Sequence, residues 1–101
     1  MAEIKIFWTK IAVAQRNQIL HYWNNRNKSN IYSKKLNNKI KEKVSLLKAN
    51  PEMGIMTEIE NTRAIFLGHY SILYKWTKKE IYIKAIWDNR QDSAKLLKMI
   101  K

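Results

Sequence analysis

The sequence predicts an α+β domain with the order strand, helix, helix, strand, strand, strand, in which a helical hairpin packs on one side of a small, mainly antiparallel sheet. Three observations predict this fold class. Apolar residues alternate with period two near the N-terminus and after residue 61, they recur three or four residues apart between residues 10 and 49, and Pro51 separates the two patterns. A length of 101 residues suits one core, so we expect a single domain over residues 1–101.

The N-terminal half supplies one strand and both helices. Alternating apolar residues predict a strand over residues 3–8, and Thr9 can cap a helix over residues 10–25. The turn-forming segment NNRNKS, residues 24–29, separates this helix from a second one over residues 30–49. The residues expected on the apolar faces are Ile11, Ala12, Ile19, Tyr22 and Trp23 in the first helix, and Tyr32, Leu36, Ile40, Val44 and Leu47 in the second.

The C-terminal half supplies three strands, predicted over residues 62–67, 70–77 and 80–87. The segments between them are short enough for hairpin turns, so the three strands should pair in antiparallel fashion. A short helix or tail over residues 91–100 ends the chain. Alternation places Ile72, Tyr74 and Trp76 on one face of the second of these strands, and Ile81, Ile83, Ala85 and Trp87 on one face of the third.

The chain is strongly basic, with a formal net charge of +12. Residues 1–50 contain 11 Lys and Arg against 2 Asp and Glu, giving +9, whereas residues 51–101 contain 9 against 6, giving +3. Such an excess favours a polyanionic partner such as nucleic acid, the ribosome or an acidic protein. The candidate lysines for nucleic-acid or target binding lie on the second helix, where a solvated helix face is the equal alternative; they are Lys34, Lys35, Lys39, Lys41 and Lys48.

Several function classes do not fit the composition. The absence of cysteine excludes disulfides, thiolate metal ligands and a cysteine nucleophile, and two histidines make a metal site improbable, so we expect neither metal nor cofactor. The N-terminus lacks the pattern of a secretory signal, and no apolar run approaches the roughly 18 residues that cross a bilayer. We therefore expect a cytoplasmic protein without a membrane partner.

Four segments follow one another in an order that is typical of a known family. They are the Tyr22-Trp23 pair, the passage LKANPEMG with Leu47, Pro51 and Gly54, the strand pair TRAIFLGHYSILYKW with Arg63 and residues 72–74, and the ending IYIKAIWDNRQD. In this order the chain resembles the RelE/ParE superfamily of toxins from type II toxin-antitoxin modules, over nearly its whole length. Members with a similar ending carry a proline near the position of Ser93, and this chain does not.

The resemblance implies a growth-inhibiting toxin of the kind that takes part in plasmid stabilisation. A cognate antitoxin, whose acidic tail wraps the helices and the sheet, would neutralise the toxin in a hetero-oligomer. ParE-like members inhibit DNA gyrase, whereas RelE-like members cleave mRNA on the ribosome. Nuclease members carry an arginine where this chain has Ser71, so the ParE-like function is preferred. The alternatives are a RelE-like mRNA endonuclease and a non-toxic, basic nucleic-acid-binding module.

Arg90 is the first candidate for chemistry that the resemblance implies. It lies close to the position at which the family places its functional arginine, at the end of the last strand. In a metal-free ribonuclease such a cation would stabilise the pentavalent phosphate. Asp88 and Asp92 flank it, so a bidentate salt bridge that secures the end of the sheet is an equal alternative.

Arg63 is the second candidate and His69 a weaker one. Arg63 opens a strand near a position where nucleases carry basic residues, but a salt bridge with Glu58 or Glu60 is the alternative. His69 could act as a general base, although a solvated histidine in a turn is favoured. Whether Arg63 and Arg90 come together depends on the strand order.

Overall fold

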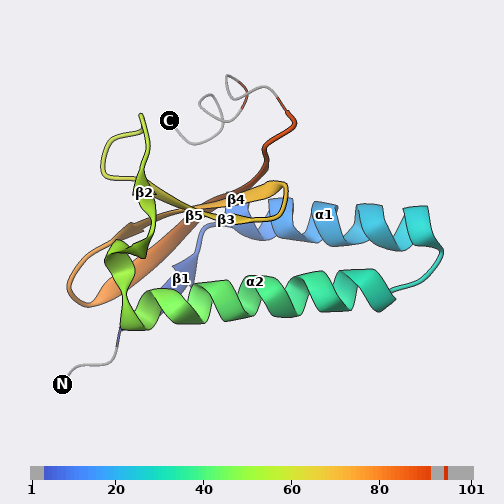
Figure 1. Cartoon of the computed structure of the whole chain (residues 1–101), viewed down its shortest axis with the longest axis horizontal. Helices are drawn as coiled ribbons and strands as arrows, with labels where there is room; N and C mark the ends of the chain where they lie inside the picture. Colours follow the sequence, from blue (N-terminus) through green and yellow to red (C-terminus); the bar gives the residue numbers. More distant parts are fainter. Residues whose placement is uncertain (1–3, 92–94, 96–101) are drawn as a thin grey trace.

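The computed structural model describes residues 4–91 and residue 95, and shows a five-stranded sheet with two long antiparallel helices on one face (Figure 1). The predicted order of elements is confirmed, with a short 3-10 helix and a two-residue strand added after the second helix. The predicted C-terminal helix falls almost wholly outside the described residues. The elements are β1 (Lys5–Trp8), α1 (Lys10–Asn27), α2 (Ile31–Ala49), η1 (Pro51–Met53), β2 (Ile55–Met56), β3 (Arg63–Leu67), β4 (Tyr70–Trp76) and β5 (Glu80–Asp88).

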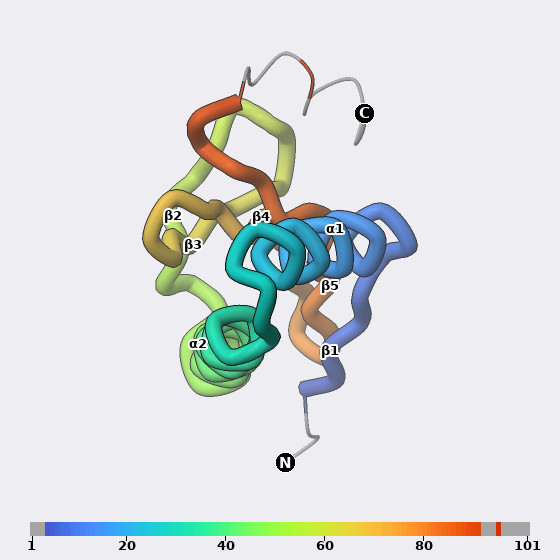
Figure 2. Tube along the Cα trace, turned by 90° about the vertical axis from the view of Figure 1, so that its right-hand side faces the viewer, coloured from blue at the N-terminus to red at the C-terminus, as the bar shows by residue number. Residues whose placement is uncertain are grey.

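The strands lie in the order β1-β5-β4-β3-β2 (Figure 2). The N-terminal strand β1 pairs in parallel with the last strand β5, with Lys5 opposite Glu80 and Trp8 opposite Ile83. All other neighbours are antiparallel, which confirms a mainly antiparallel sheet. Because β5 lies between β1 and β4, the end of the last strand adjoins both α1 and the β3–β4 turn.

The boundaries of α1 follow from its caps. The Thr9 hydroxyl oxygen accepts a hydrogen bond from the Ala12 backbone N–H at 3.1 Å, as the sequence predicted. The predicted C-terminal boundary at residue 25 is too early, because residues 26 and 27 continue the helix and Lys28 ends it with a left-handed φ of 52°. The Asn24 side chain accepts a hydrogen bond from the Ser33 hydroxyl on α2, so this residue joins the two helices instead of forming a turn.

The main core lies between the helices and the sheet. Two predicted core residues, Tyr22 and Tyr32, are instead 51% and 43% exposed. The far half of the helical hairpin extends beyond the sheet (Figure 1), so residues there have little to pack against. The buried residues of this core are Ala12, Leu36, Ile40, Val44, Leu47, Ile65, Tyr70, Ile72, Tyr74, Ile81, Ile83 and Ile86.

A bulge in β5 alters the predicted distribution of side chains. Tyr74 pairs with Ile83 and Leu73 pairs with Ala85, so Lys84 is an extra residue in β5. The extra residue reverses the alternation. Ile81, Ile83 and Ile86 therefore face the helices, whereas Ala85 and Trp87 face the opposite side, and the prediction that Ile81, Ile83, Ala85 and Trp87 share one face is wrong.

A smaller cluster covers part of the other face of the sheet. Ala64, Leu73, Ala85 and Trp87 pack there with Ile59 from the loop between β2 and β3. This face carries no helix (Figures 1 and 2). Within the described part of the chain, neither helix is long and apolar enough to span a membrane.

Candidate functional site at the end of strand β5

Asp88 and Arg90 form a bidentate ion pair where β5 ends. Arg90 Nε donates to Asp88 Oδ1 at 2.9 Å, and Arg90 Nη2 donates to Asp88 Oδ2 at 2.8 Å. The Arg90 backbone N–H also donates to Asp88 Oδ1 at 2.9 Å. These bonds from Arg90 lower the pKa of the Asp88 carboxyl, and the same pairing raises the pKa of Arg90. The predicted salt bridge is thus confirmed for Asp88, while Asp92 lies outside the described residues.

Asn89 attaches this corner to the β3–β4 turn. Its backbone N–H donates to the His69 carbonyl at 2.7 Å, and its side-chain oxygen accepts a hydrogen bond from the Ser71 hydroxyl at 2.6 Å. Both bonds hold the ends of β4 and β5 together, and so they set the place of Arg90 beside the turn. Sequence reasoning missed this role, although asparagine commonly forms hydrogen bonds in turns.

Two adjoining hollows meet at Arg90. They have volumes of about 350 Å³ and about 320 Å³ and share Tyr70 and Arg90, and together we call them the arginine cleft. The first is also lined by Gln18, Ile19, Tyr22, Asp88 and Gln91, and the second by Trp23, Tyr32, Leu36, Lys39, Leu67, Gly68 and His69. The cleft therefore joins residues of α1, α2, the β3–β4 turn and the end of β5.

The predicted basic residues divide between the cleft and the open surface. His69 is exposed in the turn and lines the cleft, as does Lys39. The other four candidate lysines on α2 are exposed and line neither hollow: Lys34, Lys35, Lys41 and Lys48. Their binding roles stay a prediction.

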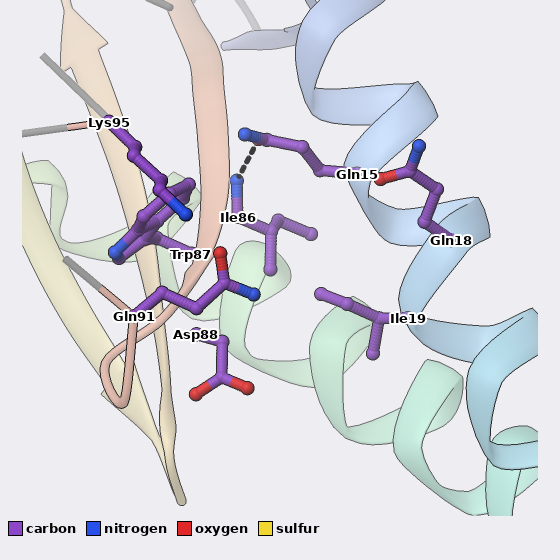
Figure 3. Close-up of a pocket in the computed structure, with 8 residues that line it drawn as sticks. All are labelled: Gln15, Gln18, Ile19, Ile86, Trp87, Asp88, Gln91 and Lys95. Carbon is purple, nitrogen blue, oxygen red and sulfur yellow. Dashed lines mark hydrogen bonds between the residues drawn. The ribbon is translucent and has the colours of Figure 1, made fainter. Parts of the chain in front are cut away.

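A third hollow of about 180 Å³ lies between α1 and the free edge of β5 (Figure 3). β1 ends at Trp8. Beyond that point, side chains of the residues that follow β1 form hydrogen bonds with the backbone of β5. The Thr9 hydroxyl donates to the Lys84 carbonyl at 3.0 Å, and the Gln15 side-chain oxygen accepts from the Ile86 N–H at 2.8 Å. Sequence reasoning missed Gln15, for which the available signal was a polar residue three positions after the core residue Ala12.

Arg63 does not join Arg90. It lies opposite Tyr74, whereas Asp88 lies opposite Tyr70, so the two sites are separated by four residues of β4, or about 13 Å. Its guanidinium donates to the Gly54 carbonyl at 2.9 Å and to the Glu52 carbonyl at 3.3 Å. The expected salt bridge with Glu58 or Glu60 is therefore wrong, because backbone carbonyls take the place of the carboxylates.

The Tyr74 hydroxyl contacts the same turn after α2 as Arg63 does. It donates to the Pro51 carbonyl at 2.6 Å and accepts a hydrogen bond from the Gly54 N–H at 2.9 Å. Burial raises the pKa of Tyr74, while the Gly54 hydrogen bond and the charge of Arg63 oppose that shift. Leu47, at the end of α2, is fully buried. The sequence motif of Leu47, Pro51, Gly54, Arg63 and Tyr74 thus serves mainly to secure the turn after α2 to the sheet.

Ser71 lies on the face of the sheet that has no helix. It lines a groove of about 380 Å³, which we call the open-face groove. Glu58 is the one ionisable residue among the groove's described lining residues. The full lining is Ile55, Met56, Thr57, Glu58, Ile59, Ala64, Phe66, Ser71, Leu73, Trp87 and Asn89.

The described residues include no group of three or more His, Cys, Asp or Glu side chains arranged to hold a metal ion.

Residues 6–93 match the family described as the ParE toxin of type II toxin-antitoxin system, parDE. No curated protein sequence matches the chain. Among solved structures, the chain is similar to one from the chromosomal ParDE TA system of P. aeruginosa, with 25% identity, a TM-score of 0.72, and coverage of 83% of this chain and 94% of that one.

Proposed function

Because the chain belongs to the ParE family of toxins from type II toxin-antitoxin systems, we propose that it inhibits DNA gyrase when free and is silenced by a cognate antitoxin. Family membership favours a toxin over the non-toxic binding module. Gyrase acts on DNA in the cytoplasm, which is where we expect the free toxin to work.

The composition of the open-face groove is the observation that carries the choice of gyrase. A metal-free ribonuclease needs cations around the scissile phosphate. At Ser71, where the nuclease branch has an arginine, this chain has a groove whose described lining is apolar or neutral apart from the acidic Glu58. No described cation lines this groove to stabilise an anionic phosphate, so a target bound by surface contact fits better than a substrate that is cut.

The arginine cleft supports the second candidate, an mRNA endonuclease. It brings the cations Arg90 and Lys39 close to His69, which is a possible general base. Against this function, Arg90 Nε and Nη2 already donate hydrogen bonds to the Asp88 carboxylate. A guanidinium neutralised in this way stabilises a pentavalent phosphate less than a free one does.

The proposed antitoxin would carry an acidic tail with apolar side chains. The toxin has a net charge of +12, which favours an acidic partner. The open-face groove has apolar residues at its rim, of which Ile55, Met56 and Phe66 are 57%, 63% and 50% exposed. Lys75, two residues after Leu73 on β4, is on the same face and exposed. A segment that buries apolar side chains in this groove can place its carboxylates at such a lysine.

The proposal is tested with the purified chain in a DNA gyrase supercoiling assay, alongside primer extension on mRNA from cells that briefly express it. We expect supercoiling to stop and mRNA to stay intact, and Arg90→Ala to weaken the inhibition. Lys78→Ala is the matched control, because it removes one exposed charge in the β4–β5 turn, outside the arginine cleft.

Codon-phased cuts in mRNA that vanish in Arg90→Ala would establish the endonuclease and overturn the gyrase proposal. Adding the antitoxin encoded beside the toxin should restore supercoiling. An antitoxin with a basic or neutral tail would contradict the proposed charge complementarity.

A further inference from the structure

Half-exposed aromatic rings line the arginine cleft on its helical side. Tyr22 and Tyr32 both contact the Trp23 ring edge to face, with centroids 5.1 Å and 4.8 Å apart and interplanar angles of 84° and 62°. Trp23 is held in place by its Nε1–H, which donates to the Tyr70 hydroxyl at 2.9 Å. The two tyrosines keep 51% and 43% of their surface exposed. They form a supported aromatic surface that no other described element covers.

Cations lie beside this aromatic surface. Lys39 lines the same hollow as Trp23 and Tyr32, and the Arg90 side chain is 54% exposed at the junction of the two hollows. Arg26 places its guanidinium carbon 5.9 Å from the centre of the Trp23 ring. The rings and the positive charges therefore share one cleft.

The charge of the cleft is only partly neutralised. Among the described residues that line the two hollows, Asp88 is the one carboxylate, and Arg90 already binds both of its oxygens. Among the described residues no group forms a hydrogen bond with Arg90 Nη1, which keeps its donors available for a ligand. A ligand with both an anionic group and a flat ring would satisfy both properties of the site.

We propose that the arginine cleft binds single-stranded nucleic acid. An unpaired base stacks on the tyrosine surface, mainly on Tyr32, and the adjacent phosphate pairs with Arg90 and Lys39. Stacking on aromatic side chains combined with cations along the backbone is the usual basis of sequence-tolerant binding to single strands. A duplex keeps its bases paired and stacked, so it cannot offer the same contact.

An acidic peptide is the other ligand that the cations could attract, but it uses less of the site. Carboxylates can pair with Arg90 and Lys39, yet a peptide of acidic residues has no flat ring to stack on Tyr22 and Tyr32. The cleft also lies on the opposite side of the sheet from the open-face groove, where we place the antitoxin segment. The half-exposed tyrosines therefore favour nucleic acid.

The test measures the fluorescence anisotropy of a labelled oligothymidylate of about eight nucleotides at low salt, with the purified full-length chain. Tyr32→Ala should weaken binding about tenfold, because stacking on that ring is lost. Tyr32→Phe keeps the ring and should bind within about twofold of the wild type. Arg90→Ala should weaken binding and lower the slope of affinity against salt by about one.

Two controls separate this site from general electrostatic attraction. Phe7 is 42% exposed on the other face of the sheet, where it stacks on Tyr82, and Phe7→Ala should leave binding within about twofold. Lys78→Ala should do the same, because Lys78 is exposed in the β4–β5 turn and lines neither hollow of the cleft. Circular dichroism of each variant checks that the fold is kept.

Several results would overturn the proposal. They are no binding, equal weakening by Tyr32→Ala and Phe7→Ala, a duplex of the same length that binds as tightly, or a glutamate peptide of equal charge that binds more tightly. The inference does not depend on gyrase as the target. Supercoiling inhibition without oligonucleotide binding would refute this inference alone, whereas oligonucleotide binding without inhibition would refute the proposed function alone.

Discussion

The two ends of strand β4 are built for different purposes. At the Tyr74 end, the hydroxyl of a fully buried tyrosine contacts two backbone groups of the turn after α2, and Arg63 binds two carbonyls of the same turn. At the Tyr70 end, Arg90 is paired with a single carboxylate and lies half exposed in a cleft. Arginine thus secures a turn at one end and lies half exposed in a cleft at the other.

This difference shows that an arginine in a family motif does not reveal its role by its position alone. Arg63 donates to two carbonyl oxygens where the chain passes from η1 to β2, so it secures this turn. Within the described part of the chain, the Arg90 side chain donates to Asp88 alone. The position of Arg90 in the arginine cleft therefore indicates its role better than its hydrogen bonds do.

Replacing the glycine near each end of β4 should give the largest contrast in the free energy of unfolding. In Gly54→Ala the new Cβ would lie 2.5 Å from the Tyr74 hydroxyl and 3.0 Å from the Ala64 carbonyl oxygen, so Tyr74 has to move and its hydrogen bonds weaken. We expect the free energy of unfolding to fall by about 3 kcal/mol. Urea denaturation followed by circular dichroism measures it.

Gly68→Ala is the matched control at the other end. Its Cβ would meet no atom within 4 Å, and only the positive φ of 59° opposes the substitution. We expect a loss of about 1 kcal/mol, and less for Gly68→Asn, because asparagine tolerates this backbone region. Equal losses at Gly54 and Gly68 would mean that the Tyr74 end is less tightly packed than its distances indicate.

Removing each arginine should separate stability from activity. Arg63→Ala leaves the carbonyls of Gly54 and Glu52 without their donor and should lower the free energy of unfolding by about 1–2 kcal/mol. Arg90→Ala should change the thermal midpoint much less, since exposed ion pairs contribute little, while it weakens target inhibition. Thermal melts and supercoiling assays of both variants test this, and a folded Arg63→Ala protein that has lost more activity than Arg90→Ala would contradict it.

The smallest effect should be the pH dependence of the Asp88–Arg90 pair. Arg90 holds the pKa of Asp88 below its ordinary value of 3.8, so the ionised carboxylate stabilises the fold above that pH. The stabilisation should disappear as the pH falls through the lowered pKa. Thermal midpoints of the wild type and Asp88→Asn should therefore differ at pH 7 and converge below pH 3.8. A difference that persists unchanged to pH 2 would show that the charge of Asp88 is not its cause.

Much of the fold could be predicted because its signals are local. The cap at Thr9, the end of α2 before Pro51 and the period-two strands each depend on residues only a few positions apart. The predictions from sequence failed where tertiary packing, and not the local pattern, decided the position of a side chain. Tyr22 has the spacing of a core residue but is 51% exposed and lines the arginine cleft.

The sequence by itself determined the order of the elements, the basic character of the chain and the presence of the family motifs. Only the tertiary structure decided which residues meet. Gln15 contacts Ile86 across 71 positions, and Trp23 contacts Tyr70 across 47. Such contacts depend on strand order, on register and on the bulge at Lys84, and a single extra residue in β5 exchanges the faces of all residues after it. Short-range periodicity carries no information about that register, so the arginine cleft could be seen only in the folded chain.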